Sequence, residues 1–265
     1  MYEGNSINLQ QFAEQSYLIL KQDYLKSLVK PSYLESFHHN IIFFRSAMRS
    51  FFERTEQERL LFEAGDYYLR PSGYRAGYWP QGVFKDVYEG KKFFAEYYYS
   101  QRYHSDNRNS LLVPENDLNS ESLPELEKLP HNQGYDMTQF VERHIIYPLV
   151  EELKIYLQPN SHLDFILQIK PIYYREEAIL EMHRDKSFFQ VVIGPLSDFI
   201  IQPDSSNKPE SVTLDVGEIF LYTGFQFQEY FKKLGVLDQV KPLTHGVISD
   251  EEKRMSIIVG AILKS

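Results

Sequence analysis

The sequence has no cysteine among its 265 residues. Disulfide bonds, cysteine-ligated zinc sites and cysteine-ligated iron–sulfur clusters are therefore excluded. The sequence also has no excess of positive charge, because 28 Lys and Arg stand against 37 Asp and Glu, for a net charge of −9. Binding to a phosphate backbone requires a surplus of Lys and Arg on one face, so we expect no nucleic-acid partner.

Long apolar runs are missing as well, since no stretch reaches the roughly 18 residues that a membrane-spanning helix needs. The first residues, Met1 to Asn5, lack the basic and apolar regions of a secretory signal. We therefore expect no membrane partner and a cytoplasmic location, and the oligomeric state cannot be read from the sequence. Aromatic residues, in contrast, are abundant: 20 Tyr and 19 Phe favour a core and pocket walls built from rings.

Apolar residues repeat at helical spacing in the N-terminal part of the chain. The repeat predicts a helix within residues 8–28 and another within residues 34–63. Residues 67–103 are rich in Gly, Pro and aromatics, which predicts short strands and turns. Residues 104–132 have the Ser, Asn, Pro and Glu content that is typical of an exposed connection.

The C-terminal part begins with an expected helix from Asp136 to about Leu157, with a kink at Pro148. Strand patterns then dominate, in residues 165–174, 188–193, 199–202, 211–214, 218–222 and 256–263. Many short strands late in one chain predict an α+β fold, mainly β, with a jelly-roll core (a double-stranded β-helix) and helices packed outside it. We expect residues 1–132 to flank the core and residues 133–265 to form it, in one compact unit.

Three residues of this core suit a metal ion. His183 and Asp185 are two positions apart, and such residues point to the same side of an extended segment. Together with His245 they supply two imidazoles and one carboxylate, the facial triad suited to non-haem Fe(II) and O2 chemistry. A His-x-Asp tripeptide alone is common by chance, so the prediction depends on its combination with His245 and with the residues that follow.

Arg254 and Ser256 come shortly after His245 with the same alternate spacing. A guanidinium and a hydroxyl on one face of a strand can hold a carboxylate by hydrogen bonds. The following residues are largely apolar on both faces of the strand, which indicates burial and a need for an anionic partner of Arg254. A carboxylate ligand meets this need, and an Asp or Glu of the protein meets it equally well.

These motifs resemble those of the Fe(II)/2-oxoglutarate-dependent oxygenases, in particular the isopenicillin N synthase-like family. The family pattern of His-x-Asp, a distal His and Arg-x-Ser is matched by His183, Asp185, His245, Arg254 and Ser256. The resemblance implies that the first three bind Fe(II) and act in catalysis. It also implies that Arg254 and Ser256 bind the co-substrate 2-oxoglutarate.

Two further segments extend the resemblance. Residues 167–174 are similar to the family strand that ends in Asn-Tyr-Tyr, which implies that Tyr174 contacts the co-substrate; Ile172 stands in place of the Asn. In the N-terminal part the likeness is weaker, and it implies that Tyr74, Arg75 and Phe93 contact the substrate.

The function implied by the resemblance is that of an oxygenase which uses O2 and 2-oxoglutarate to hydroxylate or desaturate a small, apolar or aromatic metabolite, with release of succinate and CO2. One alternative is an oxidase like isopenicillin N synthase, which does not use 2-oxoglutarate, and the absence of the Asn at Ile172 leaves it open. Another is a catalytically silent jelly-roll that binds a metal or a small acid.

Between Gly224 and His245 the chain is longer than the family turn, by a segment that spans Phe225 to Lys233. Relatives often close the pocket with a helix that follows the Arg-x-Ser strand. We expect either a more open pocket mouth or use of this segment as a lid, and the sequence does not choose between them.

Overall fold

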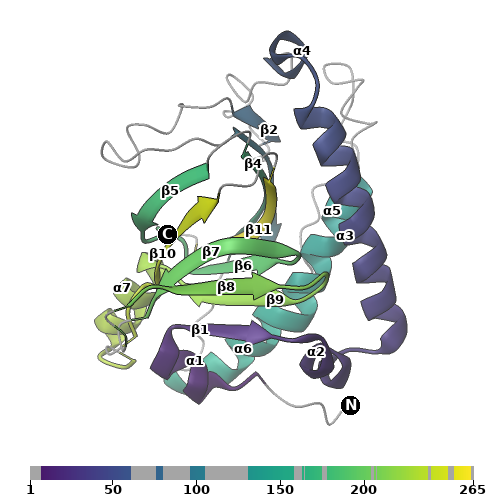
Figure 1. The fold of residues 1–265 in the computed structure, drawn as a ribbon. Coiled ribbons are helices and arrows are strands. Elements are labelled where there is room, and N and C mark those ends of the chain that lie inside the picture. The colour runs from purple at the N-terminus through teal and green to yellow at the C-terminus, as the bar shows by residue number, and fades with distance from the viewer. Residues whose placement is uncertain are drawn as a thin grey trace.

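The computed structural model of the chain is drawn in Figure 1. It describes residues 7–60, 76–79, 96–104, 131–157, 163, 165–174, 178–203, 206, 208–237, 240–249 and 254–263. Most of the connection expected over residues 104–132 lies outside the described residues.

In the described part of the chain, two antiparallel sheets form the centre of the molecule (Figure 1). The larger sheet has the order β1 (Tyr17–Leu20), β9 (Ile219–Thr223), β6 (Phe189–Ile193), β11 (Arg254–Leu263), β4 (Phe165–Tyr174), β3 (Glu96–His104) and β2 (Ala76–Trp79). The smaller sheet has the order β5 (Ala178–His183), β10 (Thr244–Ser249), β7 (Leu196–Gln202) and β8 (Glu210–Leu214).

Alternation along the strands divides the buried residues into two clusters. On β11 one face packs in a core that the sheet shares with the helices, through Met255, Ile257, Val259 and Ala261. The opposite face points between the two sheets, where residues of both pack together, among them Ile172, Val192, Phe199, Phe220 and Val247. We call this second space the barrel interior. Two facing antiparallel sheets confirm the expected jelly-roll core.

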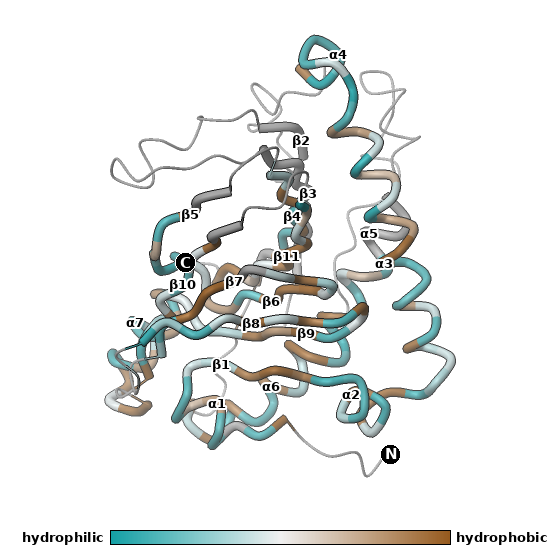
Figure 2. The backbone as a smooth tube through the Cα atoms, viewed as in Figure 1, coloured by the Kyte–Doolittle hydropathy of each residue, from teal (hydrophilic) through white to brown (hydrophobic). Residues whose placement is uncertain are grey.

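Helices lie outside the sheets, several of them along the larger sheet (Figure 1). They are α1 (Leu9–Gln15), α2 (Gln22–Leu28), α3 (Pro31–Phe52), α4 (Glu56–Leu60), α5 (His131–Val141), α6 (Tyr147–Leu153) and α7 (Phe225–Leu234). The ring of Phe52 on α3 stacks on Tyr173 of β4 at 5.0 Å between ring centroids. Figure 2 shows hydrophobic and hydrophilic residues alternating along α3, as expected of a helix with one face in the core.

The single helix expected within residues 8–28 is wrong, because β1 separates α1 from α2. Ser16 ends α1 in the left-handed conformation, with φ of 65°, and the chain then runs along the edge of β9. Leu18 and Leu20 are buried whereas Ile19 is 37% exposed. Leu20 also fits a helical repeat with Tyr24 and Leu28, and pairing with β9 decides between helix and strand.

The helix expected to end near Leu157 begins at His131, and its regularity is interrupted just before Pro148. Residues 142–146 form a π-helical turn there. Proline has no N–H to donate to the preceding turn, so a wider turn at this point has a direct cause. The expected interruption at Pro148 therefore takes the form of a π-helical turn.

The strand expected over residues 165–174 is confirmed at both ends as β4, and β6, β7, β8, β9 and β11 begin and end within three residues of their expected bounds. Residues 178–183 and 244–249 were not expected to be strands, yet they form β5 and β10. In the described part of the chain, no helix is long and apolar enough to cross a membrane.

The segment between Gly224 and His245 contains α7, and this helix is fixed to the core. Phe227 and Phe231 are 1% and 0% exposed and belong to the core beneath the helices. The ring of Phe227 lies 5.0 Å from that of Phe188 and 6.0 Å from that of Phe12. A lid movement of α7 would expose both rings to water, so this packing favours a fixed helix over a lid.

Phe227→Ala is expected to destabilise the protein by about 3–5 kcal/mol, because it leaves a cavity in the core. Phe225 lies on the same helix but is 37% exposed, so Phe225→Ala should cost less than about 1 kcal/mol. Urea unfolding of both variants measures the difference. Similar small losses for both would show that α7 is only loosely attached.

Candidate metal centre

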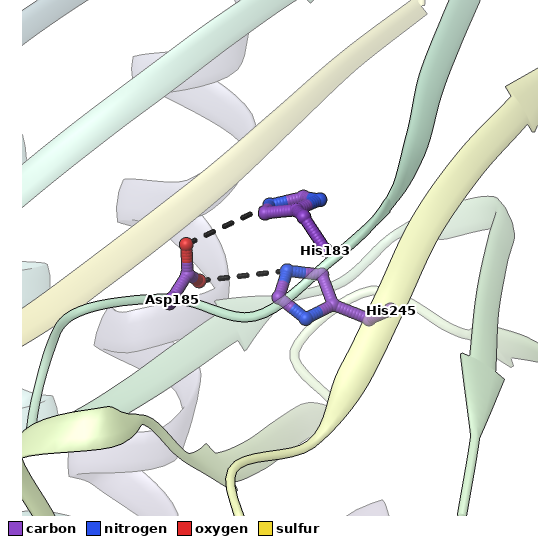
Figure 3. A group of neighbouring side chains, drawn as sticks. All are labelled: His183, Asp185 and His245. Atoms are coloured by element: carbon purple, nitrogen blue, oxygen red, sulfur yellow. Dashed lines mark ion pairs between the residues drawn. The ribbon is translucent and has the colours of Figure 1, made fainter. Parts of the chain in front are cut away.

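Three side chains meet at one end of the barrel interior, as Figure 3 shows. One potential ligand atom from each of His183, Asp185 and His245 lies within 4.8 Å of the others. The Nε2 atom of His183 is 3.7 Å from Oδ1 of Asp185, and Nε2 of His245 is 3.5 Å from Oδ2. The structure thus brings together the three residues that the sequence predicted, with two nitrogens and a carboxylate facing one point.

Strand pairing places the two imidazoles. His183 is the last residue of β5 and lies directly opposite His245, the second residue of β10. The register shifts just after His245, and Gly246 occupies this irregular position. A Cβ atom at Gly246 would lie 2.6 Å from the carbonyl oxygen of Leu180. Glycine therefore permits the close approach of β10 to β5 that sets the two histidines side by side.

A backbone hydrogen bond orients each histidine ring. Nδ1 of His183 lies 2.9 Å from the carbonyl oxygen of Glu181, and Nδ1 of His245 lies 3.2 Å from that of Leu243. A carbonyl only accepts, so each Nδ1 donates its proton, and the lone pair of Nε2 is left facing Asp185. This is the tautomer that a metal ligand requires.

The charges of the site also suit a cation. Burial raises the pKa of Asp185, but the neighbouring His245 and His183 outweigh this effect and hold it well below its usual range. Burial lowers the pKa of His245 to about 4, with Asp185 opposing and His183 adding to the shift. At neutral pH the site therefore holds an ionised carboxylate and a neutral His245, the protonation states in which both bind metals.

Tyr222 on β9 is a residue of the site that the sequence did not reveal. Its side chain is fully buried, and its hydroxyl donates to Oδ2 of Asp185 at 2.7 Å. The same hydroxyl lies 3.1 Å from Nε2 of His245. Since that nitrogen can only accept, the single phenol proton goes to one partner at a time. Tyr222 thus fixes the orientation of the carboxylate.

The loop that carries Asp185 is held by the start of α7. The amide of Phe225 donates to the carbonyl oxygen of Asp185 at 2.9 Å, and that of Gly224 donates to Phe188 at 3.1 Å. A Cβ atom at Gly224 would lie 2.1 Å from the carbonyl oxygen of Ser187. Only glycine allows this approach, so the segment between Gly224 and His245 supports the site.

Arg254 and Tyr174 form a second polar group in the barrel interior. They are paired across β11 and β4, and the guanidinium carbon lies 5.5 Å from the centre of the Tyr174 ring. Both side chains are buried. Burial raises the pKa of Tyr174 to about 12, with Arg254 lowering and Asp185 raising it, so the phenol stays protonated and can donate.

Ser256 lies two residues along β11 from Arg254, opposite Ile172. It is 3% exposed, and its hydroxyl oxygen has no hydrogen-bond partner among the described residues. A buried hydroxyl without a partner costs free energy unless a ligand supplies one. Ile172, which is also buried, offers no polar group here. The donors of Arg254, Ser256 and Tyr174 fit one end of a dicarboxylate such as 2-oxoglutarate.

Arg45 on α3 adds positive charge next to this group and was not expected from the sequence. Its pKa is lowered to about 10, first by burial and then by Arg49 and Arg254. Its guanidinium donates to the carbonyl oxygen of Pro195 at 3.3 Å. Cations that repel one another favour the binding of an anion between or beside them.

The remaining sequence predictions concern substrate contacts. Tyr74, Arg75 and Phe93 lie outside the described residues, so their role stays a prediction. Arg184, between the first two candidate ligands, is exposed and donates from Nε to the hydroxyl of Thr244 at 2.8 Å.

No protein-family model and no curated protein matches the sequence. Solved structures do match. A full-length protein from Neurospora crassa, solved in complex with alpha-KG, is 14% identical, with a TM-score of 0.58 over 97% of this chain and 78% of that one. JOX2 in complex with 2OG, Fe and JA is 15% identical, with a TM-score of 0.57 over 97% and 70%.

A third match is the 2-oxoglutarate complex of DAO1, a dioxygenase for auxin oxidation from Arabidopsis thaliana. It is 12% identical, with a TM-score of 0.56 over 96% of this chain and 86% of that one. At these identities the likeness concerns the fold. The chain thus has the fold of Fe(II)/2-oxoglutarate-dependent oxygenases along nearly its whole length.

We expect the metal-free protein to lose about 2 kcal/mol of its free energy of unfolding when the pH falls from 7.5 to 5. His245 has its pKa lowered from 6.5 to about 4 in the folded state, so the unfolded chain binds a proton in this range that the folded chain does not. Urea unfolding at the two pH values measures the loss. His245→Gln should abolish most of it, whereas His39→Gln, at an exposed position, should leave it unchanged.

Tyr222→Phe is expected to weaken Fe(II) binding by about tenfold, because Asp185 loses the donor that orients it. Anaerobic titration with Fe(II) measures the affinity. Tyr33→Phe removes a hydroxyl from an exposed position and serves as the control. An unchanged Fe(II) affinity in Tyr222→Phe would show that the carboxylate does not depend on this hydrogen bond.

Proposed function

We propose that the protein is an oxygenase that depends on Fe(II) and 2-oxoglutarate. The observation that carries the proposal is the convergence of two separate polar groups in one barrel interior. The triad of His183, Asp185 and His245 suits iron, and Arg254 and Ser256 offer hydrogen-bond donors for a carboxylate. The solved structures of similar fold that hold alpha-KG or 2OG support the same assignment.

His183, Asp185 and His245 hold the metal in this proposal. Bound Fe(II) supplies the activation of O2, which is coupled to oxidative decarboxylation of 2-oxoglutarate to succinate and CO2. The protein keeps both histidine rings in the required tautomer through the carbonyl oxygens of Glu181 and Leu243. Three protein ligands leave coordination positions open for co-substrate and O2.

The far carboxylate of 2-oxoglutarate binds at Arg254 in this proposal. The guanidinium offers charge-assisted hydrogen bonds, and the hydroxyl of Ser256 and the phenol of Tyr174 add neutral ones. Arg45 increases the positive potential of this region. The buried position strengthens these interactions, because water does not compete for the donors.

The substrate is a small molecule with an apolar or aromatic part, which is hydroxylated or desaturated in a cytoplasmic reaction. The barrel interior is lined mainly by apolar and aromatic residues. The ring of Phe199 stacks on His245 at 5.3 Å between centroids, so an apolar surface reaches the candidate metal ligands. Among the proteins of similar fold, the one from Neurospora crassa has been solved with thymine and JOX2 with JA, both of them small molecules.

A second candidate is an oxidase of the isopenicillin N synthase type, which does not use 2-oxoglutarate. Ile172 favours it, because this residue faces Ser256 without offering the polar contact of the family's Asn. A catalytically silent barrel that only binds a metal or a small acid is the third possibility. Turnover with and without 2-oxoglutarate separates the three.

The test is anaerobic titration of the Fe(II)-loaded protein with 2-oxoglutarate, followed by the visible charge-transfer band of the chelate. Arg254→Met should retain Fe(II) but weaken 2-oxoglutarate binding by about 10- to 100-fold, the usual cost of losing hydrogen bonds to a charged group. Arg143→Met, at an exposed position, is the control and should bind normally.

Two results would contradict the proposal. Fe(II) binding without the band would favour the oxidase that needs no 2-oxoglutarate. Absence of Fe(II) binding would exclude both enzymes. A band of unchanged affinity in Arg254→Met would leave the enzyme in place but remove the assignment of the carboxylate site.

A further inference from the structure

A row of cross-strand neighbours, three of them polar, crosses the inner face of the larger sheet close to the triad. Tyr222 on β9 pairs with Gln190 on β6, and Gln190 pairs in turn with Gly260 on β11. Gly260 pairs on its other side with Gln168 on β4. All four positions have the parity of the residues that pack between the sheets, such as Val192, Phe220 and Ile172. Since Tyr222 donates to Asp185, the row begins at the candidate metal centre.

Gln190 belongs to this row and has no role in the proposed reaction. It is 3% exposed, and its Oε1 atom has no hydrogen-bond partner among the described residues. A Cβ atom at Gly260 would lie 3.0 Å from Oε1, so the missing side chain of Gly260 gives the amide its place above β11. A buried amide is stable only when its polar atoms are paired, and rotation of the group can present either donor or acceptor.

Lys170 lies next to this row, one inward-facing position from Gln168 on β4. It is half-buried, and no ion pair to it occurs within the described part of the chain. Burial lowers the pKa of its amino group, and the negative charge of Asp185 partly offsets this effect. The charge of Lys170 also acts on His245. A metal ion at the triad would engage Asp185 and leave Lys170 in need of another anion.

The far carboxylate of the co-substrate, which the proposed function assigns to Arg254, is not that anion. Lys170 and Tyr174 are four residues apart on the same strand, which separates them by roughly 13 Å of backbone. Tyr174 is paired with Arg254, so the two cations lie at different levels of the barrel. Lys170 is among the groups that shift the pKa of Asp185, and Arg254 is not. Arg254 and Lys170 are therefore two cations at separate levels of the interior.

From this arrangement we infer that Lys170 and Gln190 form a subsite for a carboxylate of the substrate, beside the metal centre and apart from the Arg254 site. The inference rests on the proposed function and names its substrate class: a small apolar or aromatic carboxylic acid. Lys170 supplies the charge, Gln190 donates a neutral hydrogen bond, and the apolar walls between the sheets contact the rest of the molecule.

The experiment uses the full chain, loaded anaerobically with Fe(II) and saturating 2-oxoglutarate so that the Arg254 site is filled. The probes are benzoate, phenylacetate and 3-phenylpropionate, each compared with its neutral primary amide by calorimetry. The wild type should bind at least one carboxylate about 10- to 100-fold more tightly than its amide, as expected for a hydrogen-bonded charge.

The variants assign this preference to the subsite. Lys170→Met should abolish it and Lys170→Arg should retain it, whereas Gln190→Leu should weaken carboxylate binding by about 2- to 10-fold. Lys232→Met, at an exposed position on α7, is the control and should behave as the wild type. The inference is overturned if no carboxylate binds more tightly than its amide, or if Lys170→Met keeps the preference.

The charge-transfer band separates this inference from the proposed function. If the band forms with equal 2-oxoglutarate affinity in the wild type and Lys170→Met but the carboxylate preference is absent, the inference alone fails. If the wild type forms no band, the proposed function fails and the inference fails with it. If Lys170→Met weakens 2-oxoglutarate binding as much as Arg254→Met does, the lysine belongs to the co-substrate site and the inference is overturned.

Discussion

Because β5 and β10 pair with His183 opposite His245, two imidazoles from distant parts of the chain are fixed side by side by backbone hydrogen bonds. The other parts of the site are arranged around this pairing. Asp185 follows β5 in a loop held by the first residues of α7, and Tyr222 reaches its carboxylate from β9 in the other sheet. Each support comes from a different element, so the geometry of the triad depends on the closure of the two sheets over one another.

The two faces of the larger sheet make different demands on the kinds of residue they carry. The face toward the helices is filled by apolar residues that stack and interlock, such as Phe52 on Tyr173. The face toward the barrel interior carries polar residues as well as apolar ones, among them Arg254, Ser256 and Lys170. A strand such as β11 can satisfy both demands because neighbouring side chains point to opposite sides.

The sequence allowed the strands with strong apolar patterns to be predicted, above all β4 and β11, and it singled out the residues that come together at the triad. It did not predict β5 and β10. These strands mix charged, small and apolar residues, and their strand conformation depends on pairing with each other. β1 was missed for a related reason, since Leu20 fits a helical repeat with Tyr24 and Leu28, and only pairing with β9 makes its segment a strand. Tyr222, Gly224 and Arg45 act through residues distant in sequence, so no local spacing indicates their roles.

The hydrogen bonds from each Nδ1 to a backbone carbonyl have a consequence for metal selectivity. The rings are oriented by backbone carbonyl oxygens, which belong to the fold itself. Such a preformed set of two nitrogens and one carboxylate accepts many divalent ions of the first transition row, and the intrinsic order of their affinities does not place iron first. The identity of the bound metal would then be decided by which ions the surroundings supply during and after folding. Protein prepared in the presence of nickel, copper or zinc would carry those ions between His183, Asp185 and His245.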